Sequence, residues 1–189
     1  MSEQATQWTR GQIHAVVASY CAWTLDAFDF FLMVFILSDI AKEFAAPMST
    51  VAWGLTVTLM MRPLGAYIFG RLADARGRKP VLILDILLYS ALAFACGFAP
   101  SISALLVLRA LFGIAMGGEW GIGASLTMET IPPRARGFIS GLLQCGYPSG
   151  YLLAAIVYAT LYPLVGWRGM FMVGVIPSLV LVLYLHFCV

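Results

Sequence analysis

Long apolar segments alternate with short polar connections along almost the whole chain, and this alternation limits the possible folds more than any other feature. A helix that crosses a lipid bilayer needs about 20 mostly apolar residues, so six such helices would use about 120 residues of the 189 in the chain. We therefore predict an all-α membrane protein with six transmembrane helices. The predicted spans cover residues 14–38, 50–70, 80–98, 102–127, 137–162 and 168–187.

The composition excludes two other classes of protein. Apolar residues make up 61% of the chain and charged residues 11%, whereas soluble domains average about 45–50% and about 25%. The low charge and the 13% of aromatic residues also exclude a disordered chain. Because the net charge is only +2, we expect no nucleic-acid partner, and the expected surroundings are the lipid bilayer.

The distribution of Lys and Arg predicts the orientation of the helices. Residues 1–13 lack the apolar core of a signal peptide and are interpreted as a cytoplasmic tail, followed by the six-span bundle at 14–189. Cations concentrate in the connections after the second and fourth spans, at Arg71, Arg76, Arg78, Lys79, Arg134 and Arg136, against Lys42 and Arg168 on the opposite side. Because positively charged loops stay in the cytoplasm, we expect a multi-pass protein of the plasma (inner) membrane with both termini cytoplasmic.

Residues that could support catalysis or bind a metal do not form a recognisable pattern. Ser149 lacks the Gly-x-Ser-x-Gly frame of a hydrolase, and His14 and His186 are not part of a His-Glu-x-x-His pair. The cysteines lie in apolar segments without a close Cys or His partner, at Cys21, Cys96, Cys145 and Cys188. We therefore predict no enzyme, no metal site and no cofactor.

Two acidic residues in the first predicted span indicate chemistry inside the membrane. Asp26 and Asp29 are separated by about 60° of rotation and about 4.5 Å of rise in a helix, so both carboxyl groups should share one face. Two acids this close in a low dielectric are not expected to ionise together, so one should hold a proton near neutral pH. We interpret the pair as a proton-coupling site. The alternative is that each aspartate pairs with a basic residue on another helix and stabilises packing.

Three further charged residues lie in the predicted spans, where each costs at least about 2.5–3.5 kcal/mol near a helix centre. Arg109 and Glu119 belong to the same span but are too far apart along and around a helix to pair. A forked guanidinium suits a carboxylate substrate, so Arg109, Arg62 and Glu119 are candidate substrate-binding residues. Structural salt bridges to embedded acids are the alternative. A polar cavity through the bundle would account for all of these charges.

The fifth predicted span contains candidate cavity residues beside a proline. Pro148 should interrupt the helical hydrogen bonds and bend the span, and we include Gln144 and Tyr147 beside it among the substrate-binding candidates.

Small residues that favour close helix packing recur in the fourth span, at Gly113, Gly117 and Gly121. A gating surface is the alternative role for these glycines.

The connection between the second and third spans has the most specific pattern, GRLADARGRK at residues 70–79. Gly77 can turn the chain, and Asp74 can cap a helix end or pair with Arg78. A solvated positive loop would explain the cations but not the ordered glycines and aspartate. The stretch resembles the signature loop of the major facilitator superfamily, Gly-x-Leu-x-Asp-x-x-Gly-Arg-Lys.

Other segments resemble the same superfamily in order along the chain. Arg109 with the glycines after it resembles the span-4 motif, and Glu129 with Pro133 and Arg136 resembles the motif of the connection between spans 4 and 5. The stretches LDAFDF, CGFAP and GGEWG are similar to the sialate:proton symporter family, most of all to its lactate-permease-type carboxylate transporters. Residues 62–80 and 117–121 are also similar to the metabolite:proton symporters.

The resemblance implies a secondary active transporter for the proton-coupled symport of a small organic anion of the lactate or pyruvate type. It also implies a 3+3 inverted repeat and a gating loop, which would include Gly70, Asp74, Gly77, Arg78, Lys79, Glu129 and Arg136. Members of the family have two six-span halves with the substrate between them, so a second six-span half is the expected partner. The alternatives are a symporter for sialic acid or another metabolite, and a truncated, non-transporting remnant.

Overall fold

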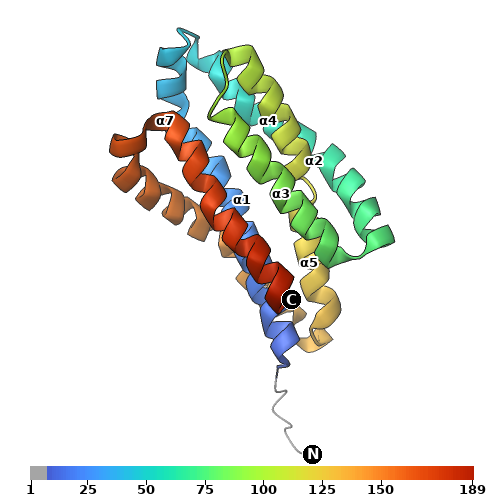
Figure 1. Ribbon diagram of the computed structural model, residues 1–189. Coiled ribbons are helices and arrows are strands. Elements are labelled where there is room, and N and C mark those ends of the chain that lie inside the picture. Colours follow the sequence, from blue (N-terminus) through green and yellow to red (C-terminus); the bar gives the residue numbers. More distant parts are fainter. Residues whose placement is uncertain (1–7) are drawn as a thin grey trace, which may run out of the picture.

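Helices form almost all of the computed structural model, which describes residues 8–189 and has no strand in that range (Figure 1). In chain order the elements are α1 (Arg10–Glu43), α2 (Met48–Arg76), α3 (Arg78–Cys96), α4 (Ile102–Met116), α5 (Glu119–Thr130), the short 3-10 helix η1 (Pro133–Ala135), α6 (Arg136–Gln144) and α7 (Gly146–Cys188). Of the predicted tail, residues 1–7 lie outside the described residues, and α1 already begins at Arg10.

Polar residues at the helix ends explain where the helices extend beyond the predicted apolar spans. α1 starts with a capping box, in which the Gln12 amide donates to Thr9 Oγ1 and the Thr9 amide donates to Gln12 Oε1. This reciprocal pair satisfies amides that the first turn leaves free, so the helix begins before the apolar segment does. At Gly77, φ is 92°, and this left-handed residue separates α2 from α3 at the predicted turn.

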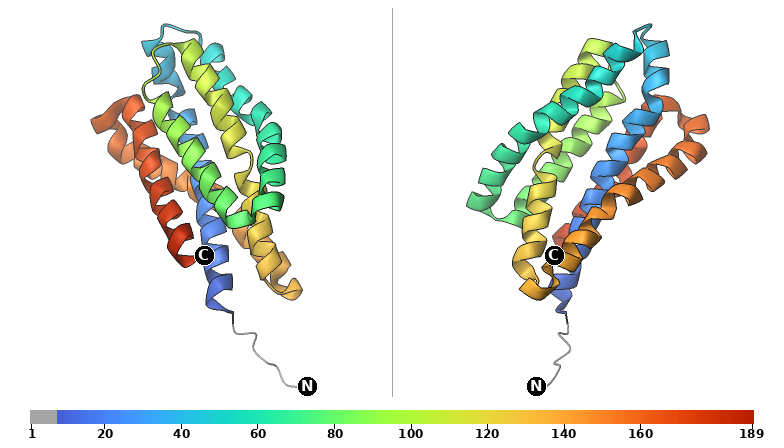
Figure 2. Two further views of the ribbon diagram at one scale, coloured as in Figure 1. Left: turned by 45° about the vertical axis from the view of Figure 1, so that its right-hand side comes forward. Right: turned by 180° about the vertical axis from the view of Figure 1, so that it is seen from behind.

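The last two predicted spans fall within α6 and α7. The chain leaves helical geometry at Gly166, where φ is 63° and ψ is −178°, and the second part of α7 turns back from there toward the other end of the bundle (Figure 2). The fourth predicted span is divided at Gly117 and Gly118 into α4 and α5. The fifth is divided at Cys145, three residues before Pro148, as expected for a proline-induced break.

Four helical stretches in the described part of the chain are long and apolar enough to cross a membrane: Arg10–Glu43, Arg78–Cys96, Ile102–Thr130 and Pro133–Cys188. The last stretch contains the reversal at Gly166. α2, which carries Arg62, Arg71 and Asp74, is not among the four. The apolar helices indicate an integral membrane protein, whereas the count of six spans and the inverted repeat remain predictions.

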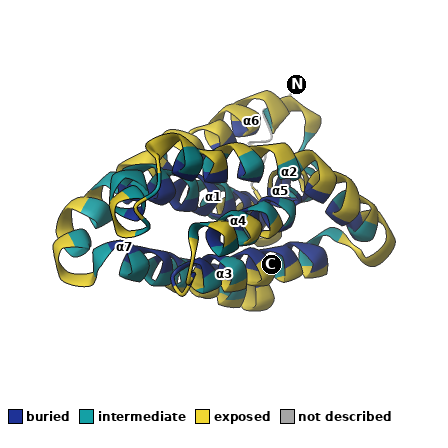
Figure 3. Cartoon of the chain, turned by 90° about the horizontal axis from the view of Figure 1, so that it is seen from above, coloured by how far each residue is buried: buried dark blue, intermediate teal, exposed yellow. Residues whose placement is uncertain are grey.

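Glycine allows α2 and α4 to touch through their backbones. A methyl group added at Gly113 would overlap the carbonyl oxygen of Thr58, and one added at Gly117 would overlap that of Arg62. From the other side, a methyl group at Gly65 would overlap the Ile114 carbonyl. The predicted packing role therefore holds for Gly113 and Gly117 but is wrong for Gly121, whose surroundings are open. Figure 3 shows buried residues on the inner helix faces and exposed residues around the outside.

Candidate functional site

Six charged side chains from five different helices collect inside the bundle, and we call them the buried polar cluster. The cluster consists of Asp26, Asp29, Arg62, Asp85, Arg109 and Glu119. All but Arg62 are at most 6% exposed. Five of the six are candidates from the sequence, and the fold brings them together from α1, α2, α4 and α5.

Asp26 forms a two-point ion pair with Arg62. The Arg62 Nη2 atom donates to Asp26 Oδ1 at 2.9 Å, and Nη1 donates to Oδ2 at 3.2 Å. The Asp26 carboxylate therefore has its own guanidinium, which is the structural salt bridge considered as an alternative for both residues. Arg62 also lies 3.0 Å from the sulfur of Met116, so it connects α1, α2 and α4.

Asp29 and Arg109 face the second part of α7 without forming an ion pair with each other or with another described residue. A methyl group added at Gly174 would lie 2.5 Å from Asp29 Oδ1, so this glycine makes the space that the carboxyl group occupies. The Arg109 guanidinium lies between two aromatic rings, with its Cζ atom 4.4 Å from the centre of the Phe112 ring and 4.7 Å from that of Phe171. Such rings favour a cation and leave its hydrogen-bonding edge available for a carboxylate.

Glu119 and Asp85 are buried without hydrogen-bond partners. Neither oxygen of either carboxyl group has a partner among the described residues, and the two residues are 1% and 0% exposed. Asp85 was missed in the sequence, although it is an acid in the middle of the apolar segment at 80–98. The rule that singled out Asp26 and Asp29, an ionisable residue inside a span, would have found it.

The other two predicted substrate-binding residues lie at the edge of the bundle. Gln144 is the last residue of α6 and is exposed, and Tyr147 at the start of α7 is 41% exposed. The Tyr147 ring packs against Trp23 and Phe31 of α1, with ring centres 6.3 and 5.2 Å apart. These two residues are therefore separate from the buried polar cluster and lie on an exposed aromatic surface.

The signature loop is connected to α5 through one arginine. Arg78 Nη1 lies 2.7 Å from Asp74 Oδ1, and Arg78 Nη2 lies 3.1 Å from Glu129 Oε1. Lys79 donates to the backbone carbonyl of His186 at 3.2 Å, which attaches the loop to the end of α7 as well. The predicted pairing of Asp74 with Arg78 is thus present. Two other predicted gating residues have open surroundings, Gly70 and the exposed Arg136.

At the opposite end of the bundle, Glu43 joins α1 to the reversal in α7. Arg168 donates to Glu43 Oε1 through Nη2 at 2.7 Å and Nε at 3.1 Å, and Trp167 donates to Oε2. The hydrogen bonds from Arg168 and Trp167 lower the pKa of the Glu43 carboxyl group. The Arg168 Nη1 atom also donates to the carbonyls of Gly97 and Ala99. The contact of Glu43 with Trp167 and Arg168 was not predicted, because Glu43 is more than 100 residues away from both in the sequence.

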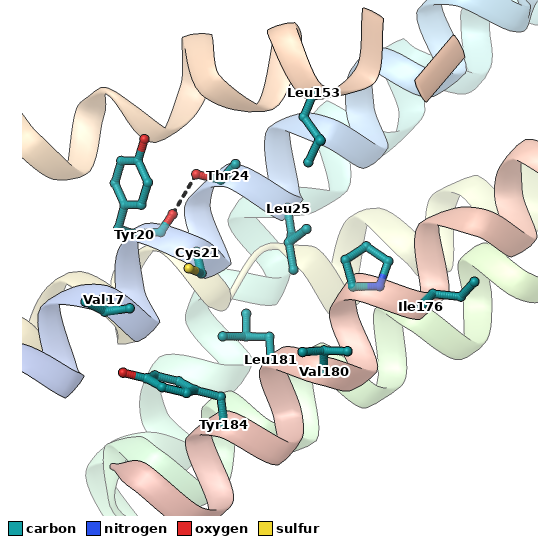
Figure 4. Close-up of a pocket in the computed structure, with 11 residues that line it drawn as sticks. Val17, Tyr20, Cys21, Thr24, Leu25, Leu153, Ile176, Val180, Leu181 and Tyr184 are labelled. Atoms are coloured by element: carbon teal, nitrogen blue, oxygen red, sulfur yellow. Dashed lines mark hydrogen bonds between the residues drawn. The ribbon is translucent and has the colours of Figure 1, made fainter. Parts of the chain in front are cut away.

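Two cavities differ in the chemistry of their walls. One of about 590 Å³ lies between α1 and the two parts of α7 (Figure 4) and has only apolar side chains and the hydroxyls of Tyr20, Thr24 and Tyr184 at its wall, apart from the thiol of Cys21. It lacks the charges needed to bind an organic anion. The other, of about 180 Å³, lies between α2 and α5 and is lined by Asp74, Arg78 and Gly118, among others. We call it the loop-side cavity.

The known proteins that the chain resembles are transporters. The description "Major Facilitator Superfamily" belongs to the family whose sequence model matches residues 19–188. A putative metabolite transport protein of Haemophilus influenzae is 36% identical over 88% of this chain and 41% of that protein. The niacin transporter NiaP of Acinetobacter baylyi is 34% identical over 83% and 36%, and the sialic acid transporter NanX of Escherichia coli is 30% identical over 96% and 46%.

Solved structures have the same fold. A bacterial homologue of the human lysosomal transporter Spinster matches 96% of this chain with a TM-score of 0.86 at 20% identity, and the proton:xylose symporter XylE matches 93% with a TM-score of 0.83 at 18% identity. The chain spans less than half the length of these relatives and structures. By sequence and by fold, the chain belongs to the Major Facilitator Superfamily, whose members that it matches are transporters and not enzymes.

Proposed function

We propose that the chain is part of a secondary active transporter that carries a small organic anion together with a proton. The charge balance of the buried polar cluster supports this proposal most directly. Its four carboxyl groups and two guanidinium groups would together have a net charge of −2 if all were ionised. Because unbalanced charge is strongly disfavoured in a low dielectric, the cluster is expected to hold protons, which a symporter binds and releases during transport.

Asp29 is the residue to which we assign the transported proton, and Arg109 is the one to which we assign the substrate. Asp26 is already neutralised by Arg62, whereas Asp29 has no ion pair in the part of the chain described. Arg109 likewise has no carboxylate partner there and is held between aromatic rings. Moving one charge against the membrane potential costs about 2.3 kcal/mol per 100 mV. An anion that enters together with a proton moves less net charge and so avoids part of this cost.

A monocarboxylate of the lactate or pyruvate type is the substrate that we propose. The relatives' names support an acidic substrate, since niacin and sialic acid are both carboxylic acids. A proton symporter for sialic acid or another metabolite is the alternative. Glu119, Gln144, Tyr147 and Arg62 would contribute to discrimination between these acids, the exposed Tyr147 through its aromatic surface.

We further propose that the chain forms six spans with both termini in the cytoplasm and works with a second six-span half. The fraction of the relatives' length that it covers supports this arrangement. The ion pairs from Arg78 to Asp74 and Glu129 would hold the cytoplasmic side closed. Opening would then require that these exposed pairs separate, a small energetic change for each pair.

Uptake measurements in proteoliposomes test the proposal. The chain is reconstituted alone and as a fusion with the C-terminal half of NanX, and uptake of labelled lactate, pyruvate, nicotinate and sialic acid is measured with and without an inward proton gradient. We expect the gradient to accelerate uptake of at least one acid, and a protonophore to remove the effect. Uptake by the fusion, together with no uptake by the chain on its own, would support the need for a second half.

Matched variants separate the proton site from general damage to α1. Asp29→Asn should remove the gradient effect, whereas Asp39→Asn, on the same helix but close to its end, where it pairs with Lys42, should leave it unchanged. Equal uptake with and without the gradient in the unaltered protein, or a normal gradient effect in Asp29→Asn, would contradict the proposal.

A further inference from the structure

We infer that Asp85 and Glu119 form a second proton-binding pair, which passes protons between the centre of the bundle and the loop-side cavity. This inference rests on the proposed proton coupling and extends it to a residue outside the predicted site. The proton would leave the Glu119 carboxyl group, bind the Asp85 carboxylate, and continue to water in the cavity. The reverse order would return it.

The two residues lie close together at the junction of α4 and α5. A methyl group added at Gly118 would lie 3.2 Å from Asp85 Oδ1, so the aspartate on α3 reaches the backbone directly beside Glu119. Both residues are almost completely buried, and all four carboxyl oxygens lack a hydrogen-bond partner among the described residues. Polar atoms in such positions are rarely left unpaired, so we assign at least one proton to the pair.

Tyr89 supports this interpretation independently. It lies one helical turn after Asp85 and is 0% exposed, and its hydroxyl group lies near the Ser178 hydroxyl of α7. Glu119 and Asp29 both act on this hydroxyl as nearby charges. A buried hydroxyl group can donate to a carboxylate or to a water molecule, so we include Tyr89 in the proposed proton path.

The charges around Asp85 do not neutralise it. Asp26 of α1 and Glu119 of α5 act as like charges in this region, and the opposing cation, Arg62 of α2, is bound by Asp26 through both terminal nitrogens. Arg109 of α4 acts on Asp29. Two adjacent acids that share no cation of their own hold one proton between them more readily than none, and this is the state from which a proton can be transferred.

The loop-side cavity provides the route to solvent. Its volume of about 180 Å³ is several times the roughly 30 Å³ that one water molecule occupies. Asp74, Arg78 and Ser125 give it a polar wall, and Gly118 is part of the same wall. Asp85 Oδ1 also lies close to Gly118, beside the Phe69 side chain, so the buried pair adjoins this wall of the cavity.

The first test detects the proton itself. Infrared spectra of the reconstituted chain are recorded across neutral pH, and the carbonyl band of protonated carboxyl groups is compared among variants. Asp85→Asn should remove part of this band and Asp85→Glu should retain it, whereas Ser90→Ala, an equally buried change without a titratable group on the same helix, should leave it intact. An unchanged band in Asp85→Asn would overturn the inference.

The second test separates proton movement from substrate movement, with labelled lactate as the probe in the form of the protein that transports it. Asp85→Asn should lower gradient-driven uptake by about tenfold or more and leave exchange of internal for external lactate at equal pH unchanged. An equal loss in both assays, or a loss also in Ser90→Ala, would overturn the relay. Absence of gradient-driven uptake in the unaltered protein would refute the proposed symport instead, and the infrared band would still decide whether Asp85 binds a proton.

Discussion

Arg62 binds Asp26 with both of its terminal nitrogens, at 2.9 and 3.2 Å, and so joins α2 to α1 inside the bundle. This pair divides the buried acids into two kinds. Asp26 has a permanent counter-charge, whereas Asp29, Asp85 and Glu119 have none in the described chain. Proximity in the sequence does not predict this division, because Asp26 and Asp29 lie on the same helix face and yet differ in their partners.

Loss of one partner of this pair should destabilise the protein strongly. Arg62→Gln leaves Asp26 buried without its counter-charge, and such single changes cost about 3–5 kcal/mol. In detergent, the unfolding temperature should therefore decrease strongly in Arg62→Gln. It should decrease less in the double variant that combines Arg62→Gln with Asp26→Asn. Equal effects of the single and double changes would contradict a direct interaction between the two residues.

Alanine at the contact between α2 and α4 should separate the two helices. Gly117→Ala would force a methyl group against the Arg62 carbonyl, and overpacking of this kind costs about 1–3 kcal/mol. Gly121→Ala is the matched control, because it is one turn further along with open space around it, and alanine favours a helix over glycine by about 1 kcal/mol. We expect a lower unfolding temperature for the first variant and an unchanged or higher one for the second.

The connection at Glu43 should make stability depend on acidic pH. Hydrogen bonds from Arg168 and Trp167 lower the pKa of Glu43 below its ordinary value near 4.5. The folded state therefore favours the ionised form of this carboxyl group more than the unfolded state does. The stabilisation is complete above that ordinary value and is lost as the pH falls through the lowered pKa. The side chains of Arg168 and Glu43 are 37% and 44% exposed. The ion pair should therefore contribute no more than about 1 kcal/mol to the free energy of unfolding.

Unfolding curves for Arg168→Gln and the unaltered protein provide the measurement. The difference in the free energy of unfolding between the two proteins should shrink as the pH is lowered below the ordinary pKa of a glutamate. A difference that grows on acidification would be opposite in sign to the expected one.

Arg78 should be more sensitive to substitution than its neighbour Arg76. Arg78 contacts Asp74 and Glu129 through different nitrogens, and a lysine cannot reproduce that fork, so both Arg78→Gln and Arg78→Lys should change the uptake rate. Arg76→Gln removes the same charge from an exposed residue two positions away and should have little effect. Uptake assays in proteoliposomes compare the three variants, and equal effects would mean that loop charge alone matters.

Local chemistry made much of this architecture predictable. Apolar length placed the helical segments, Gly77 marked the turn between α2 and α3, and the spacing in the signature loop indicated the Asp74–Arg78 pair. The helix ends were harder to predict, because caps such as Thr9 with Gln12 lie outside the apolar segments.

The partners of distant residues could not be predicted in the same way. Nothing in the order of residues states that Glu43 meets Arg168, or that Asp85 reaches Gly118. These contacts depend on how α3, α5 and α7 pack in three dimensions. Glu119 was recognised as embedded, but its neighbour on α3 became evident only from the fold.

The backbone contact between α2 and α4 also restricts how the protein can change shape. With Arg62 and Thr58 carbonyls lying directly against Gly117 and Gly113, one helix cannot slide past the other without collision. The two helices must therefore move as a single rigid body. A change in the shape of the bundle would therefore move this unit against the neighbouring helices, and the ion pairs from Arg78 to Asp74 and Glu129 at one of its ends would have to separate or move with it.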